Sequence, residues 1–207
     1  MYKVYIDTRL ITISSQPDRM QNYCLFHKFH DQKELSDQLK LFLNDSSLKC
    51  INIYSYKLDH LWASFVEEFH LVEAAGGIVV DSQRNLLLIK RYNHWDAPKG
   101  HFEPSETPEE CARREINEEC GVKCGKRMAE LKTTFHIYTF EGEYYLKKSY
   151  WFLFTLAGSA LTIAQTEEGI TEASWVNQDR FNEVRENMWP SVNDVINEVL
   201  VNHLPYL

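Results

Sequence analysis

Three carboxylates in the middle of the chain, Glu115, Glu118 and Glu119, have a spacing that could bind divalent metal ions. On a helix, which turns by about 100° per residue, positions 118 and 119 lie within roughly 60° of position 115. Like charges this close repel one another and destabilise a helix that has no cation beside them. Carboxylate oxygens at this density are the ligands that Mg²⁺ or Mn²⁺ requires, and such a metal also bridges phosphate oxygens. Taken alone, a run of this kind is more often a solvated acidic face.

The helix that must carry these carboxylates is predicted over residues 108–120. Thr107 is placed as its N-cap, Pro108 as its first residue, and Glu110 completes a capping box. Gly121 stands at the C-terminal stop. An apolar stripe for the core recurs every fourth residue, at Ala112, Ile116 and Cys120. The glutamates therefore occupy a different face from the residues that pack inward.

The residues around this helix match a known family pattern. The matching positions are Gly100, Glu106, Arg114, Glu115, Ile116, Glu118, Glu119, Gly121 and Val122. With five residues after the first glycine and seven after the first glutamate, the stretch resembles the Nudix box, G-x5-E-x7-R-E-U-x-E-E-x-G-U with U aliphatic, at every defined position. The resemblance favours a metal site over a solvated face. It implies a Nudix hydrolase, which cleaves a nucleoside diphosphate or polyphosphate linked to a further group.

The resemblance also implies roles for individual residues. Mg²⁺, with Mn²⁺ as an alternative, would be bound by Glu115, Glu118, Glu119 and the carbonyl of Gly100. Glu106 and Arg114 would pair as a scaffold between loop and helix. In the family, a glutamate base activates the attacking water. The candidate catalytic residues are Glu118 and Glu119 on the helix, and Glu168, beside Glu167, in a later loop. For Glu167 and Glu168, a plain solvated loop is an equally open interpretation.

The substrate is indicated by residues outside the box. The stretch WDAPKGHFEP is similar to one in the dinucleoside polyphosphate hydrolase branch, which makes Lys99 and His101 candidates for contacts with phosphate. Tyr138 lies near the place of that branch's base-stacking tyrosine, although packing in a strand is an equally ordinary role. Lys147 and Lys148 resemble a lysine-rich strand of the branch, and Lys148 is the candidate for the outer phosphates.

Two other functions stay open. The first is nucleoside triphosphate pyrophosphohydrolysis, because the box is shared among branches and the loops that select the substrate are not readable. The second is a catalytically inactive, nucleotide-sensing Nudix module. Such modules usually lose box carboxylates, and all are present here. The absence of proline between Pro108 and Pro190 argues against the ADP-ribose branch.

The fold class expected is α/β, a Nudix α/β/α sandwich with a mixed sheet over residues 71–207. A small N-terminal α/β unit of unknown role, residues 1–70, precedes it; dimerisation, covering of the site and simple packing are open roles. The elements expected are strands at 2–13, 49–55, 128–140, 144–156 and ASWV, a hairpin from Ala74, a helix capped by Asp31 and Glu34, a helix at 58–69, and a last helix opened by Ser191 and Asp194. The stretch from Asn93 to Glu106 is expected to be loop.

Composition sets limits on partners and compartment. The net charge of −8 and the absence of a basic run argue against polymeric nucleic acid. The negative charge also works against polyanionic ligands unless bound cations reverse it locally, and the small nucleotide substrate is what the family resemblance implies. No apolar run is long enough for a membrane span, and no signal is evident, so a cytoplasmic protein is expected. Five cysteines without a CxxC pair are expected to be reduced and mostly buried.

Overall fold

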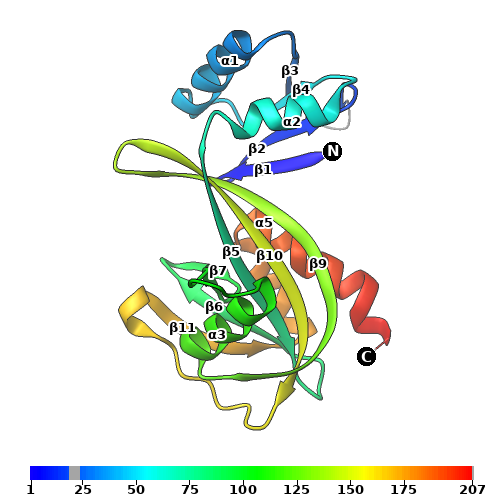
Figure 1. Ribbon diagram of the computed structural model, residues 1–207. Coiled ribbons are helices and arrows are strands. Elements are labelled where there is room, and N and C mark those ends of the chain that lie inside the picture. The colour runs from blue at the N-terminus through cyan, green and yellow to red at the C-terminus, as the bar shows by residue number, and fades with distance from the viewer. Residues whose placement is uncertain (19–23, 207) are drawn as a thin grey trace. The chain divides into compact units, whose positions relative to one another are not determined.

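The computed structural model describes residues 1–18 and 24–206, and its contacts divide the chain into two compact units. The first unit comprises Met1–Val72 and Phe135–Lys147, and the second comprises Glu73–Thr134 and Lys148–Leu207. Three strands pass from one unit into the other: β5 (His70–Val80), β9 (Lys123–Phe140) and β10 (Glu143–Ala157), as Figure 1 shows. The tip of the β9–β10 hairpin therefore belongs to the first unit. The proposed division into domains 1–70 and 71–207 stays a prediction.

The first unit is built on short strands beside the hairpin tip. They are β1 (Tyr2–Ile6), β2 (Arg9–Ser14), β3 (Cys24–Lys28) and β4 (Cys50–Tyr54), in the order β9-β1-β2-β4-β3. The single strand expected over residues 2–13 is wrong, because β1 and β2 form an antiparallel hairpin. Its turn places Asp7 at φ 51° without a glycine, so the sequence carries no strong turn signal there. The β4 strand pairs in parallel with β2 and β3.

Two helices complete the core of the first unit. Helix α1 (Gln32–Asn44) begins at Asp31, whose carboxylate accepts from the backbone N–H of Glu34 at 2.9 Å. Helix α2 (Leu58–Val66) ends three residues earlier than expected. Their apolar faces pack on the strands, and the buried apolar residues of the two helices are Leu35, Leu39, Phe42, Leu61 and Phe65. Their spacing of three or four residues places them on one face of each helix.

The second unit contains the predicted β5–β6 hairpin. Strand β6 (Leu86–Arg91) is antiparallel to β5 and to β11 (Ile170–Val176), and the strand order is β11-β6-β5-β10-β9. The expectation that residues 93–106 are all loop is wrong. Strand β7 (His94–Asp96) pairs with β6, and β8 (Lys99–His101) pairs with β5. Pieces of three residues are too short to show a period in the sequence, and only the pairing of their backbones defines them.

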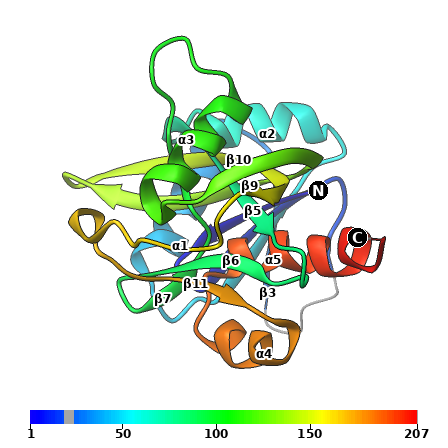
Figure 2. The ribbon, with the colours of Figure 1, turned by 90° about the horizontal axis from the view of Figure 1, so that it is seen from below.

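Helices cover both faces of this sheet. Helix α3 (Pro108–Cys120) packs on one face against residues that include Val79, Leu87 and Phe154. Helices α4 (Gln178–Glu186) and α5 (Pro190–Glu198) pack on the other face, against the intervening positions Ile78, Leu88 and Leu153. In Figure 2, β6 and β11 lie between α3 and α4. The alternation of the two sets of strand residues confirms the α/β/α sandwich.

The end of the chain corrects two expectations. Helix α4, capped by Asn177, was not predicted, because its few apolar residues make a weak pattern. Helix α5 begins at Pro190, with Trp189 as its N-cap, so Ser191 and Asp194 do not open it. It is followed by a π-helical turn at Val199–His203 and a 3-10 turn at Leu204–Tyr206. A 3-10 turn at Thr166–Glu168 precedes β11.

Within residues 1–18 and 24–206, no helix combines the length and the apolar character needed to cross a bilayer. Four cysteines have described side chains, and each of these is a free thiol: Cys50, Cys111 and Cys120 are buried and Cys124 is partly buried. The expectation of reduced, mostly buried thiols is confirmed for these four. The side chain of Cys24 lies outside the described part of the chain.

Candidate functional site

Helix α3 begins and ends where the sequence predicts. The Thr107 hydroxyl accepts from the backbone N–H of Glu110, whose carboxylate accepts from the backbone N–H of Thr107. Such a cap stabilises a helix by about 1 kcal/mol. Gly121 closes the helix at φ 69°, a left-handed conformation that glycine adopts without strain. These two ends fix which side chains of α3 face the sheet and which face the loops.

Two of the three predicted metal-binding glutamates are buried, which corrects the expectation of a carboxylate cluster at the surface. Glu119 is 0% exposed and Glu115 is 7% exposed, whereas the Glu118 side chain is 46% exposed. Strand β8 and the segment before β11 cover this face of α3. A buried carboxylate costs several kcal/mol unless its charge is compensated. The groups that contact Glu115 and Glu119 therefore have to account for the burial of each carboxylate.

Arg114 connects the loop to the helix as predicted, and it does more than the predicted pair requires. Its guanidinium donates to both carboxylate oxygens of Glu106 at 2.9 and 3.0 Å. It also donates to Glu115 at 2.7 Å, to Glu118 at 2.9 Å and to the His101 carbonyl at 2.9 Å. Hydrogen bonds from Arg114 lower the pKa of Glu106, and those carboxylates raise the pKa of Arg114. Arg114 is the cation that offsets repulsion within the acidic face.

We expect the Glu106–Arg114 pair to contribute to stability in a way that a double-mutant cycle can isolate. Glu106→Ala and Arg114→Ala should each destabilise the fold, and the double variant should cost about 1–2 kcal/mol less than the sum. The free energy of unfolding, from urea titrations, gives this coupling. Glu109 supplies the control, because it pairs with Arg113 and Arg127 rather than with Arg114. Strict additivity for Glu106 with Arg114 would contradict the pair.

Gly100 forms a cradle for the Glu115 carboxylate. Strand β8 pairs with β5, with Gly100 opposite Ala75, and this pairing holds the β8 backbone against α3. A Cβ at position 100 would lie 2.1 Å from Glu115 Oε1 and 2.3 Å from Oε2. The carboxylate therefore sits where only a glycine leaves room. Burial raises the pKa of Glu115, and hydrogen bonds from Arg114 oppose that rise.

Glu119 is a fully buried carboxylate with one satisfied oxygen. Its Oε2 accepts from the backbone N–H of Lys99 at 2.9 Å, and its Oε1 has no hydrogen-bond partner. Burial raises its pKa to about 8, against the lowering effects of Lys99 and Arg91. Arg91 Nη1 lies 3.5 Å from Oε1, an ion pair without a hydrogen bond. An uncompensated buried oxygen of this kind needs an explanation beyond packing.

Arg91 also brings Glu168 to this side of the domain. Its Nη2 lies 3.4 Å from Glu168 Oε2, and the segment before Glu168 is tied to α3 by the N–H of Gln165, which donates to the Glu119 carbonyl at 3.2 Å. Glu168 is near enough to Glu115 for its charge to raise the Glu115 pKa. Sequence reasoning had missed Arg91. Its only signal was a charge at the end of an apolar strand, immediately before the loop that carries the box.

The donor set around α3 fits a divalent cation. Within the described residues, no three Asp, Glu, His or Cys side chains converge as a ready set of metal ligands, because Arg114 draws Glu115 and Glu118 to itself. Even so, the same helix carries the unpartnered Glu119 oxygen and the Glu115 carboxylate held on Gly100, and both are hard oxygen donors. A cation bound there would give Glu119 Oε1 the direct contact that the Arg91 ion pair at 3.5 Å does not provide.

Comparison with known proteins decides the family. A family model described as the NUDIX domain matches residues 70–199, which is more than half of the 207 residues. The chain belongs to the Nudix family.

Individual relatives agree with this assignment over part of their length. A Mycobacterium tuberculosis (strain CDC 1551 / Oshkosh) protein provisionally named mutator protein MutT4 is 31% identical over 114 residues, which are 50% of this chain and 45% of that protein. A protein of Invertebrate iridescent virus 3, provisionally named hydrolase 111R, is 36% identical over 59 residues, which are 28% of this chain and 35% of that protein. The matches thus span less than half of each relative.

A solved structure shows the same fold. A bifunctional NMN adenylyltransferase/ADP-ribose pyrophosphatase from Francisella tularensis, complexed with AMP and a manganese ion, matches with a TM-score of 0.51 at 15% identity. The match covers 69% of this chain and 44% of that one. A C. elegans Ap4A hydrolase complex matches with a TM-score of 0.49 at 19% identity, over 62% of this chain and 95% of that one.

In the Nudix domain, the two predicted phosphate-binding residues of the loop have other contacts. Lys99 Nζ pairs with Asp96 at 2.5 Å, and its backbone N–H serves Glu119. His101 is exposed, and its carbonyl accepts from Arg114. Their roles in binding substrate stay predictions. What the structure adds is that Lys99 positions Glu119 through its backbone.

Lys148 belongs to the same unit and is held by two partners. Its ammonium contacts Glu73 Oε1 at 3.2 Å and Tyr150 Oη at 2.5 Å, and Tyr150 donates to Glu73 at 2.7 Å. Burial lowers the Lys148 pKa, but these contacts outweigh it and raise the pKa. The Tyr150 ring also meets Phe102, just after β8, edge-on at 6.0 Å. Lys148 therefore lies near the start of the box loop, already neutralised by Glu73.

Tyr138 and Lys147 belong to the other compact unit. Tyr138 stacks on Tyr145 with ring centroids 5.5 Å apart, and Lys147 Nζ lies 5.1 Å from the Tyr138 centroid. The base-stacking role of Tyr138 stays a prediction, and its present contacts are those of an aromatic cluster at the hairpin tip.

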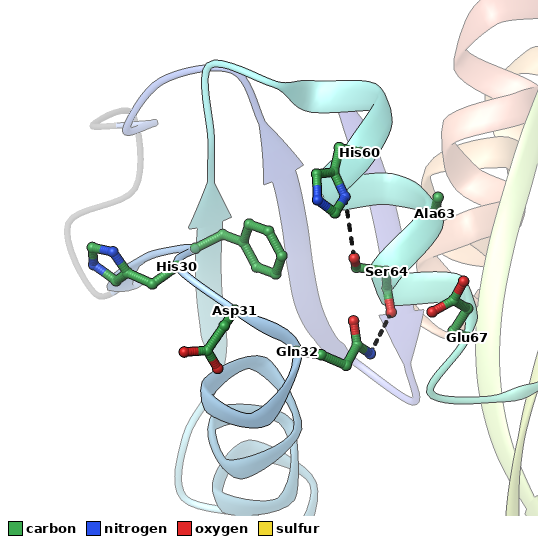
Figure 3. A pocket seen from close by; sticks show the side chains of 8 residues that line it. His30, Asp31, Gln32, His60, Ala63, Ser64 and Glu67 are labelled. Atoms are coloured by element: carbon green, nitrogen blue, oxygen red, sulfur yellow. Dashed lines mark hydrogen bonds between the residues drawn. The ribbon is translucent and has the colours of Figure 1, made fainter.

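An open pocket of about 430 Å³ lies in the N-terminal unit (Figure 3). It is lined by Phe29, His30, Asp31, Gln32, His60, Ala63, Ser64 and Glu67. Two local contacts join some of its polar groups: His60 Nδ1 lies 3.4 Å from Ser64 Oγ, and Gln32 donates to the Ser64 carbonyl at 3.0 Å. All of its lining residues precede the matched Nudix region.

Proposed function

We propose that the Nudix domain is a metal-dependent pyrophosphohydrolase that acts on a nucleoside diphosphate derivative. The observation that carries this proposal is that α3 holds both a buried, unpartnered Glu119 oxygen and a Glu115 carboxylate cradled on Gly100. A fold does not need such a costly arrangement, because burying carboxylates lowers stability. Catalytic sites retain it because it binds charge. The family assignment supports the same conclusion.

Each residue of the site has a task in this proposal. Glu115, Glu118, Glu119 and the Gly100 carbonyl would hold Mg²⁺ or Mn²⁺. The cation, when bound, would polarise a phosphoryl oxygen and lower the pKa of a bound water. The Lys99 N–H orients Glu119, and Arg114 keeps Glu115 and Glu118 on the same side of α3. Arg114 also has a bidentate contact with Glu106, which does not involve the residues that would hold the cation.

The general base is assigned to a glutamate at this centre, with Glu168 and the helix pair Glu118 and Glu119 as the candidates. Arg91 favours Glu168, because its guanidinium holds that carboxylate beside Glu119. A base must lie within hydrogen-bond reach of the water it activates, and loop residues often reach it only when substrate binds. Glu168→Gln should therefore reduce kcat rather than affinity for the substrate.

Among substrates, a dinucleoside polyphosphate is supported best by the PKGH loop and by Lys148 near it. A nucleoside triphosphate is the second candidate. It is favoured by the pairing of Lys148 with Glu73, which leaves less charge for distal phosphates. The name of the M. tuberculosis relative also points to a mutator-type enzyme. A sensor module without catalysis is the remaining alternative, and phosphate release that requires Mg²⁺ would exclude it.

A substrate panel tests the proposal. Dinucleoside tetraphosphates, ADP-ribose, oxidised nucleoside triphosphates and diphosphoinositols are compared by kcat/KM, and we expect the tetraphosphates to rank first. Lys148→Ala should then lose about 1.5–3 kcal/mol more on a tetraphosphate than on a diphosphate, since only the longer chain extends to that cation.

The adjacent Lys147→Ala is the matched control, because its ammonium lies over Tyr138 in the other unit. Equal losses on long and short substrates would remove the argument from Lys148. A tenfold preference for ADP-ribose or an oxidised triphosphate would overturn the substrate class and leave the hydrolase intact.

A further inference from the structure

A tyrosine occupies an unfavourable backbone position at the turn between β6 and β7. Arg91 pairs with His94, so Tyr92 and Asn93 form a two-residue hairpin turn, with φ of 49° and 64°. Turns of this kind require positive φ at both residues and favour Asn and Gly. A bulky side chain with positive φ is an outlier. Among the described non-glycine residues with positive φ, Tyr92 is the single aromatic one, and strained backbone of this kind clusters at active sites and ligand clamps.

The Tyr92 ring does not contribute to the core. It is 72% exposed, so burial does not compensate for the strained backbone. It leans on Gly169, where a Cβ would lie 3.1 Å from Tyr92 Cε1 and 3.4 Å from Cζ. The Arg91 guanidinium lies 5.5 Å from the ring centroid. Two neighbours therefore fix the orientation of the ring while most of its surface stays in water.

Both neighbours belong to the carboxylate centre. Arg91 links Glu119 to Glu168, and Gly169 directly follows Glu168. The Nε of Arg91 is buried and has no hydrogen-bond partner, although a buried guanidinium donor normally has one. The Arg91 side chain as a whole is 27% exposed, so part of its guanidinium is open to a ligand although Nε is covered. The turn thus places a partly exposed cation and an exposed aromatic ring on adjacent residues.

We propose that Tyr92 is a specificity-determining residue that stacks with the base of the nucleotide substrate, while the partly exposed Arg91 guanidinium contacts a phosphate oxygen of the same molecule. A nucleotide carries a flat base and anionic phosphates, so an aromatic ring beside a cation can bind both parts. The face of a tyrosine ring stacks with any of the bases. The inference rests on the proposed hydrolase function and assigns the base subsite of that same centre. It explains why tyrosine stands where asparagine would cost the turn less.

Tyr92→Asn tests this proposal without threatening the fold, because asparagine is a preferred residue at that turn position. We expect the melting temperature to stay equal or rise. The Kd of ADP with Mg²⁺, from isothermal titration calorimetry, should increase roughly tenfold, and the Kd of inorganic pyrophosphate, which has no base, should not change. Tyr92→Phe keeps the ring and should stay within about twofold of wild type for ADP. In turnover, KM should rise tenfold while kcat is nearly constant.

The outcomes separate the two proposals. If the wild-type chain hydrolyses nucleotides and Tyr92→Asn binds ADP as tightly as wild type, the stacking role is overturned and the hydrolase stands. If no nucleotide is hydrolysed but the tenfold loss for ADP is found, the base subsite stands and the reaction is wrong. Equal weakening of ADP and pyrophosphate, or no ADP binding by wild type, also overturns the stacking role.

Discussion

Glu118→Gln should reduce turnover by about three orders of magnitude while the domain stays folded. Its side chain is 46% exposed and forms an ion pair with Arg114, so an amide of the same size leaves packing unchanged. What is lost is a negative ligand for the proposed cation, which would polarise the phosphate. Such stabilisation of the transition state amounts to several kcal/mol, and each 1.36 kcal/mol is about a factor of ten in rate. Phosphate release with saturating Mg²⁺ and a melting curve on the same sample measure both quantities.

Glu109→Gln on the same helix is the matched control for Glu118→Gln. Glu109 pairs with Arg113 and Arg127, so its loss should lower stability slightly and leave turnover unchanged. Hydrolysis near the wild-type rate in folded Glu118→Gln would remove Glu118 from the metal site. A loss of the same size in Glu109→Gln would mean that charge on α3, rather than a ligand, controls the rate.

Local signals made α3 and its caps predictable. Thr107, Pro108 and Gly121 act through bonds within a few residues, so spacing in the sequence fixes them without tertiary information. The Glu106–Arg114 pair was predicted for a similar reason, because the family pattern specifies both residues. The sandwich was implied by the family resemblance, and the runs of strand and helix of clear period agreed with it.

Burial and long-range contacts were not predictable in the same way. Periodicity placed Glu119 on a polar face, yet β8 covers that face, and Lys99 meets the carboxylate from twenty positions away. Arg91 joins Glu119 and Glu168 because β6 and the segment before β11 end side by side, a fact of strand pairing. Short strands such as β7 exist only through their partners. The electrostatics of the site therefore depend on tertiary pairing, which propensity does not encode.

Gly100→Ala should abolish most of the hydrolytic activity, because the alanine Cβ would clash with the Glu115 carboxylate. The added Cβ would lie 2.1 Å from Glu115 Oε1, far inside van der Waals contact, and β8 cannot withdraw without breaking its pairing with β5. Glu115 must therefore rotate away, which removes it from the cation and strains its bond to Arg114. We expect kcat/KM to fall by at least about a hundredfold, since misplacement of a catalytic group by about 1 Å costs that much. Mn²⁺ affinity, measured by electron paramagnetic resonance, should fall in parallel.

Combining Gly100→Ala with Glu115→Gln shows whether the clash acts through that carboxylate. Positive φ is recorded for Gly121, Gly142, Gly158 and Gly169 but not for Gly100, so alanine there is strained by the neighbour rather than by its own backbone. If displacement of Glu115 is the whole effect, the double variant should lose no more activity than Glu115→Gln alone, because residues acting as a unit are not additive. Additive losses of activity would mean that Gly100→Ala acts by another route, through a shift of the β8 backbone or of the Gly100 carbonyl itself. Full activity and unchanged Mn²⁺ affinity in Gly100→Ala would show that Glu115 is free to leave its cradle without consequence, and the carboxylate would then have no part in binding the cation.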